Sequence, residues 1–97
     1  MTFDSLDFEN FQWDSGNDRK SLDRHGITCK EGEEIFFNNQ LYVIYDKKHS
    51  RTEPRYKAFG MTNQRKALTV SFTVREKFIR IISARLMNRR ERKAYEI

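Results

Sequence analysis

The chain has 97 residues, 37% of them hydrophobic and 34% charged, with a net charge of +5 at pH 7. It contains no apolar run long enough to span a membrane, and its start, Met1-Thr2-Phe3-Asp4, lacks the basic and apolar regions of a secretory signal. Its single cysteine, Cys29, excludes an internal disulfide and a cysteine metal cluster, so we expect one cytoplasmic domain over residues 1–97 that needs no metal or cofactor.

The first residues predict a loose lead-in followed by a short strand. Residues 1–7 show no periodic pattern, which is typical of a poorly ordered terminus. Phe8, Phe11 and Trp13 then stand among polar neighbours, a pattern that fits a half-buried strand at the edge of a sheet. The rings of Phe11 and Trp13 could stack on bases, but packing in the core is the favoured interpretation.

A first helix is expected after this strand. Asp14 or Ser15 can cap it, because a short oxygen-bearing side chain satisfies the exposed N–H groups of the first turn. The helix would run to about Arg24 with Leu22 on its inner face, and Gly26 fits its C-terminal end.

The second helix has a clearer start signal. Thr28 and Glu31 have the spacing of a capping box, in which each side chain accepts a hydrogen bond from the backbone of the other residue. Ile35 and Phe36 continue this helix, and the pair Asn38-Asn39 can end it.

The rest of the chain predicts strands and one last helix. Residues 41–45 could be a short strand or an extended packed segment, and the polar stretch 46–54 is expected to be a loop. Three strands joined by hairpin turns follow, over residues 55–61, 67–74 and 78–85. Asn88 can cap a helix over residues 89–96. The expected fold is α+β: a small antiparallel meander of three to four strands, with two N-terminal helices and one C-terminal helix.

Charge is distributed unevenly along the chain. Residues 1–46 hold four Lys/Arg against ten Asp/Glu, a net charge of −6, whereas residues 47–97 hold fifteen against four, a net charge of +11. This asymmetry indicates a basic working surface for a polyanion, most plausibly nucleic acid. The alternative, that the two halves neutralise each other on the folded surface, is equally compatible with charge alone.

Several short motifs occur in a familiar order. They are Phe11-Gln12-Trp13-Asp14, Arg24-His25-Gly26-Ile27-Thr28, Glu34-Ile35-Phe36, His49-Ser50 followed by Glu53 and Arg55, Phe59-Gly60, Leu68-Thr69-Val70, Arg80-Ile81-Ile82-Ser83-Ala84-Arg85, and Arg89-Arg90-Glu91-Arg92 with Tyr95. From about Phe11 to Tyr95 the chain resembles the BrnT family of toxins from type II toxin–antitoxin systems. The segment from Arg80 to Arg85 is the most specific part of this resemblance.

The resemblance implies a fold and a function. Members of the family are small RelE-like ribonucleases that inhibit translation by cutting RNA. A BrnA-type antitoxin with a ribbon-helix-helix DNA-binding part neutralises them, typically in an assembly of two toxins and two antitoxins, and operator DNA is bound only through the antitoxin. The expected partners are therefore RNA and the antitoxin, and no membrane.

Cutting RNA without a metal needs a base for the ribose 2′-hydroxyl, a cation for the charged transition state and an acid for the leaving oxygen. The catalytic candidates are Arg80 and Arg85 for the phosphate, His49 for proton transfer and Glu53 as a base or as a partner that orients His49. His49 could instead only bond local backbone, and Glu53 could only pair with Arg51 or Arg55.

The two arginines present a geometric problem. Arg80 and Arg85 are five residues apart, which places them on opposite faces of a regular strand. Either the strand ends before Arg85, or a bulge changes the direction of one side chain, or the two serve different surfaces. A structural alternative is that one of them pairs with an acidic residue of the N-terminal half.

Further basic and aromatic residues are expected to hold the RNA. These candidates are Arg55, Lys57, Arg89, Arg92 and Tyr95. Tyr95 could equally anchor the last helix to the sheet, and the basic run of that helix could be an ordinary solvated face. The alternative function is a basic module that binds RNA or an acidic protein without cutting anything.

Overall fold

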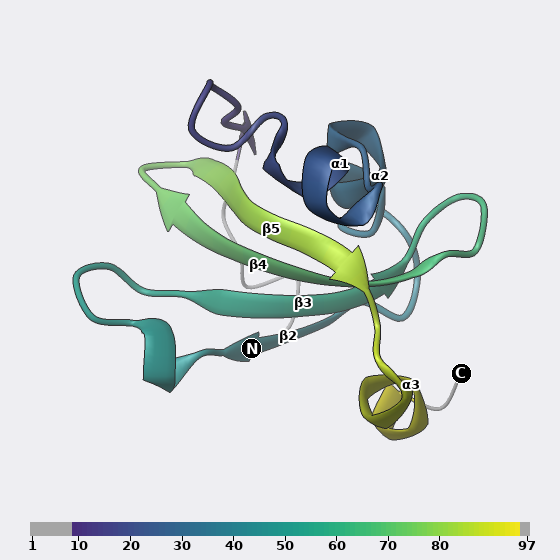
Figure 1. Cartoon of the computed structure of the whole chain (residues 1–97). Coiled ribbons are helices and arrows are strands. Elements are labelled where there is room, and N and C mark those ends of the chain that lie inside the picture. Colours follow the sequence, from purple (N-terminus) through teal and green to yellow (C-terminus); the bar gives the residue numbers. More distant parts are fainter. Residues whose placement is uncertain (1–8, 96–97) are drawn as a thin grey trace.

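The computed structural model describes residues 9–95, so the lead-in over residues 1–7, Phe8 and the helix end at Glu96 lie outside the described residues. Within them, one sheet has the strand order β1-β5-β4-β3-β2, with α1 and α2 on one face and α3 beyond the other (Figure 1). The elements are β1 (Asn10–Phe11), α1 (Lys20–His25), α2 (Cys29–Glu34), β2 (Tyr42–Tyr45), the 3-10 turn η2 (Lys47–His49), β3 (Tyr56–Met61), β4 (Ala67–Arg75), β5 (Phe78–Leu86) and α3 (Arg89–Tyr95). None of these helices is long and apolar enough to cross a membrane.

The meander is confirmed, but the sheet is not purely antiparallel. β2, β3, β4 and β5 pair antiparallel in sequence order, whereas β1 adds a fifth strand that runs parallel to β5 through the pairs Asn10–Phe78 and Phe11–Ile79. A two-residue strand has too little pattern of its own to reveal the strand with which it pairs. The prediction of a purely antiparallel sheet of three to four strands was therefore wrong, because β1 adds a fifth strand that runs parallel to β5.

The predicted capping box of α2 and the predicted glycine end of α1 form, but the predicted N-cap of the first helix at Asp14 or Ser15 was wrong. Thr28 and Glu31 make the reciprocal capping box at α2, and Gly26 ends α1 with a φ of 70°, a left-handed conformation that glycine adopts without strain. The first helix starts only at Lys20, because residues 15–19 form turns, and its N-cap, Arg19, makes no side-chain capping hydrogen bond. Leu22 is 45% exposed, so its placement on an inner face was wrong.

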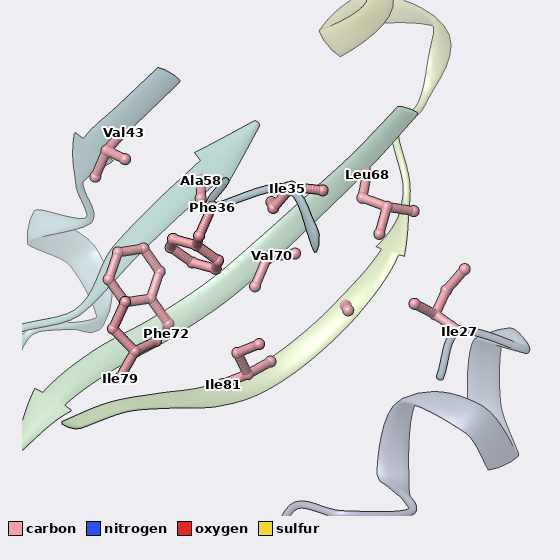
Figure 2. Close-up of a cluster of buried hydrophobic side chains, with 11 residues drawn as sticks. Ile27, Ile35, Phe36, Val43, Ala58, Leu68, Val70, Phe72, Ile79 and Ile81 are labelled. Atoms are coloured by element: carbon pink, nitrogen blue, oxygen red, sulfur yellow. The ribbon is translucent and has the colours of Figure 1, made fainter. Parts of the chain in front are cut away.

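The core lies between α2 with its following turn and one face of the sheet (Figure 2). Its largest buried side chains are Phe36, Phe72, Ile35, Leu68, Ile79, Ile81 and Val70. The rings of Phe36 and Phe72 meet edge to face at 5.1 Å. Gly32 lets α2 approach β5 closely, because a Cβ there would lie 3.3 Å from Ile81 Cδ1. Each large side chain buried here contributes roughly 1.5–3 kcal/mol.

A bulge in β5 resolves the problem of the two arginines. Ser71 pairs with Ser83, but the next residue of β4, Phe72, pairs with Ile81, so Ile82 is an extra residue in β5. Arg80 consequently pairs with Thr73 and Arg85 with Thr69. Directly paired residues share a face, and Thr69 and Thr73 are four apart on one strand. Both arginines therefore belong to the sheet face opposite α1 and α2, called the outer face below.

Candidate functional site

The loop between β2 and β3 is closed by its own hydrogen bonds. The Ser50 hydroxyl donates to the carbonyl of Asp46 at 2.7 Å and accepts from the backbone N–H of Arg55 at 2.8 Å. The backbone N–H of Asp46 also donates to the carbonyl of Arg55 at 2.8 Å. Because one hydroxyl joins both ends of the loop, His49 and Arg55 are placed relative to each other.

His49 is held by a carboxylate of the same turn. The Asp46 side chain caps η2, and its Oδ2 lies 2.8 Å from Nδ1 of His49, whose side chain is 55% exposed. Burial alone would raise the pKa of Asp46, but the hydrogen bond and charge of His49 outweigh it and lower that pKa. The arrangement leaves the other ring nitrogen of His49 available for proton transfer.

This loop borders a depression on the outer face of the sheet. Its volume is about 250 Å³, and its lining residues are Asp46, His49, Arg55, Lys57, Ser71, Ile82, Ser83 and Arg85. Lys57, Ser71 and Ser83 form one cross-strand row over β3, β4 and β5. Because the two serine side chains are small, the sheet surface at Ser71 and Ser83 is recessed, and cationic side chains surround it. The depression therefore suits a phosphate group.

Arg55 contributes an unsatisfied donor beside the depression. Its Nε is buried and has no hydrogen-bond partner within residues 9–95. A buried donor without a partner costs about 1–3 kcal/mol, and such groups often mark a place where a ligand or solvent completes the bonding.

Arg85 reaches the depression while it is paired with α3. Its guanidinium donates to both carboxylate oxygens of Glu91, at 2.7 and 2.9 Å. Glu91 also accepts from the Thr69 hydroxyl at 2.9 Å and from the backbone N–H of Asn88 at 2.9 Å. The bond from Arg85, with these further bonds, lowers the pKa of Glu91 to about 2 although burial opposes it. The predicted Asn88 cap is confirmed, since its Oδ1 accepts from the Glu91 backbone at 2.8 Å.

Arg80 lies outside the depression. It donates to both oxygens of Asp14, at 2.8 and 2.9 Å, and to Gln12 at 3.2 Å, and its side chain is only 14% exposed. The hydrogen bond from Arg80 is the main cause that lowers the pKa of Asp14. These contacts correspond to the structural alternative, a pair with an acidic residue of the N-terminal half. The shared face thus does not bring Arg80 and Arg85 into one pocket.

Glu53 is likewise engaged away from His49. It forms a two-point ion pair with Arg75, with both N–O distances 3.0 Å. That hydrogen bond is the main cause that lowers the pKa of Glu53. The neighbouring carbonyl of Pro54 accepts from Thr73 at 2.6 Å, so the end of the loop is fixed to β4. Here Asp46, and not Glu53, is the carboxylate that contacts His49.

The residues of α3 divide into two groups. Arg89 and Arg92 are exposed on the helix surface. Tyr95 packs edge to face against Tyr42, with ring centroids 6.0 Å apart, which corresponds to the predicted anchor of α3 on the sheet. Burial raises the pKa of Tyr95.

Asp46, Ser50 and the two serines of the cross-strand row were absent from the sequence-based candidates. Asp46 could have been found, because an Asp three residues before a His is the spacing of a capped turn that returns the carboxylate to the ring. Ser71 and Ser83 belong to strands that are far apart in the sequence, and their pairing required the register.

Residues 9–95 contain no group of three or more His, Cys, Asp or Glu side chains arranged to hold a metal ion.

Comparison with known proteins gives one family. Residues 13–91 match the family described as ribonuclease toxin, BrnT, of type II toxin–antitoxin system. No curated sequence is similar enough to the chain to be matched.

Proposed function

Because the chain belongs to the BrnT family of ribonuclease toxins of type II toxin–antitoxin systems, we propose that it cuts RNA in the depression on the outer face of its sheet, without a metal ion. The observation that carries this proposal is the Asp46–His49 pair at the rim of a hollow bordered by three permanent or near-permanent cations, those of Arg55, Lys57 and Arg85. An oriented imidazole and a group of cations are the parts that phosphodiester transfer requires.

The proposed reaction is attack of the ribose 2′-oxygen on the adjacent phosphorus. His49 takes the proton of the 2′-hydroxyl as the new P–O bond forms, and Asp46 stabilises the imidazolium that results. Arg55 and Arg85 bind the non-bridging oxygens, where negative charge grows. The bond to the 5′-oxygen breaks, and Lys57 can donate the proton that this oxygen takes up. The products are a 2′,3′-cyclic phosphate and a 5′-hydroxyl.

The remaining predicted site residues have other roles in this proposal. Arg80 and Glu53 support the site through their pairs with Asp14 and Arg75 and do not touch the substrate. The exposed Arg89 and Arg92 extend the basic surface for the flanking nucleotides, and Tyr95 anchors α3.

We further propose that RNA cleavage inhibits translation in the cytoplasm and that a BrnA-type antitoxin neutralises the toxin. The family supports a protein antitoxin as the partner. The assembly of two toxins and two antitoxins, and operator binding through the antitoxin alone, extend the proposal by analogy with the family.

The test is cleavage of single-stranded RNA by the purified chain in excess chelator. We expect cleavage in the presence of chelator, products with a 2′,3′-cyclic phosphate, and a rate at least 100-fold lower for Arg85→Ala. Intact RNA with both proteins would refute the proposal, and activity restored by added Mg²⁺ would refute metal independence.

The second candidate function is a basic binding module without catalysis. The observation that favours it is that Arg80 and Arg85 are each paired with a carboxylate of the chain itself. Salt-dependent RNA binding without products would support this candidate.

A further inference from the structure

β2 is the last strand of the described sheet, and its outer edge presents backbone hydrogen-bonding groups. The backbone N–H of Asp46 donates to the carbonyl of Arg55, and residues of an antiparallel pair alternate between bonded and non-bonded positions. In the register of β2 and β3, every second residue of β2 therefore bonds β3. The alternate residues of β2, Val43 and Tyr45, do not bond β3 and point their backbone N–H and C=O groups away from it, toward the free edge.

Large apolar side chains lie beside this edge. Tyr42, Ile44 and Tyr45 are 65%, 47% and 53% exposed. On the outer face, a groove of about 260 Å³ separates β2 and β3 from α3, lined by Tyr42, Ile44, Phe59, Glu91, Ala94 and Tyr95. A strand added at this edge would find backbone partners along β2 and an apolar floor for its side chains.

The flanks of the edge are basic. Exposed Lys47 and Lys48 follow β2 after Asp46, and Arg92 and Lys93 are exposed on α3, the helix that forms one wall of the groove. Lysines next to an edge strand oppose its pairing with a second copy of the chain, because two basic edges would face each other. The complementary partner is an extended segment in which apolar and acidic residues alternate.

From these three features we infer that the edge of β2 and the groove beside α3 bind an acidic, extended segment of the antitoxin, which adds a strand to the sheet. The inference rests on the proposed function only in naming the antitoxin as the partner. The apolar side chains of the segment enter the groove, and its carboxylates meet the lysines after β2 and the cations of α3. The groove shares no lining residue with the depression, although the two are neighbours: Ile44 of the groove pairs with Lys57 of the depression, and Glu91 of the groove accepts hydrogen bonds from Arg85.

The test measures binding of the full chain to the purified protein encoded by the adjacent antitoxin gene, by calorimetry without RNA. Ile44→Glu should weaken binding at least 10-fold, because it places a carboxylate on the apolar floor. The matched control is Leu22→Glu on α1, a side chain of similar exposure far from β2, which should change affinity less than twofold. Thermal unfolding of both variants verifies that they fold.

Amide hydrogen exchange provides a second measurement that does not depend on a variant. The antitoxin should slow exchange at Val43 and Tyr45, whose N–H groups face the edge, and much less at Tyr42 and Ile44, which already bond β3. Tight binding with neither the Ile44→Glu effect nor this alternation would overturn the inference. Slower exchange in the toxin alone at rising concentration would also overturn it, in favour of a second copy.

A catalytic variant separates this inference from the proposed function. His49→Ala should bind the antitoxin as tightly as the unaltered chain does, whether or not the unaltered chain cleaves RNA. Failure of cleavage would leave the binding results unaffected, and failure of binding would leave the cleavage assay unaffected.

Discussion

Thr69 and Arg85, paired across β4 and β5, both donate hydrogen bonds to the carboxylate of Glu91. This carboxylate joins α3 to the outer face at the margin of the basic depression. It occupies the same guanidinium fork that a phosphate would use. Glu91 therefore holds α3 to the sheet and, in the proposed mechanism, competes with the substrate phosphate for Arg85.

The first prediction concerns this competition. Glu91→Gln keeps the shape of the side chain and removes its charge, so affinity for a 2′-deoxy RNA analogue that cannot be cleaved should rise severalfold at low salt. The control, Glu76→Gln, removes one negative charge from the exposed turn between β4 and β5. If both variants raise affinity equally, general charge and not the release of Arg85 is the cause. Fluorescence anisotropy over a range of salt concentrations makes the measurement.

The second prediction concerns proton transfer. His49→Ala should lower kcat by roughly 100-fold or more, as loss of a general base does. Asp46→Asn should reduce kcat by a smaller factor with little change in KM, because the ring loses its orienting partner while the cations remain. His25→Ala is the matched control, since it removes the other histidine, which is exposed on α1. Equal rates for His49→Ala and His25→Ala would remove His49 from the mechanism.

The third prediction concerns stability in acid. The folded pKa of Glu91 is about 2, below its ordinary value of 4.5, so the unfolded chain binds more protons between these two values. The stabilisation by Glu91 is therefore fully present above about pH 4.5 and is lost as the pH falls toward 2. Its size is roughly 1.5–3 kcal/mol, typical of hydrogen bonds to a charged group.

Urea unfolding of the unaltered chain and of Glu91→Gln provides the measurement. The variant should be less stable at neutral pH, and the two proteins should converge in stability as the pH approaches 2. A difference that stays constant across this window would show that Glu91 contributes through packing and not through its charge.

The fourth prediction separates a structural Arg80 from a catalytic one. Asp14→Asn weakens the ion pair but keeps the guanidinium, whereas Arg80→Ala removes it. If the role is structural, both variants should lower the unfolding temperature and both should retain most of the cleavage activity when assayed where they are folded. Loss of cleavage in Arg80→Ala alone, with Asp14→Asn active, would return Arg80 to the chemistry.

Local signals were sufficient for much of the fold. The Thr28–Glu31 box, the Gly26 end and the Asn88 cap each depend on residues within a few positions, and each forms as predicted. The hairpins also follow from short turns between alternating strands. The parallel pairing of β1 with β5 joins residues more than sixty positions apart, and no local pattern encodes it.

The candidate site divides in the same way. His49 could be found from its chemistry, but the ion pairs of Arg80 with Asp14 and of Arg85 with Glu91 depend on where the chain returns in space. A sign was present for the bulge, since the doublet Ile81-Ile82 interrupts the alternation of apolar and polar residues in β5. It permits a bulge without specifying which of the two isoleucines is the extra one.

The extra residue in β5 has a consequence for how this segment can vary. Four residues lie between Arg80 and Arg85, and on a regular strand this even number would place the two side chains on opposite faces. Because one of the four, Ile82, is the extra residue of the bulge, the two arginines share the outer face. Loss of a single residue there would leave three intervening residues, so the two arginines would share one face of a regular strand without any bulge. Removal of Ile82, the extra residue, should therefore be the length change that this stretch tolerates best, although it would also remove a side chain that lines the depression.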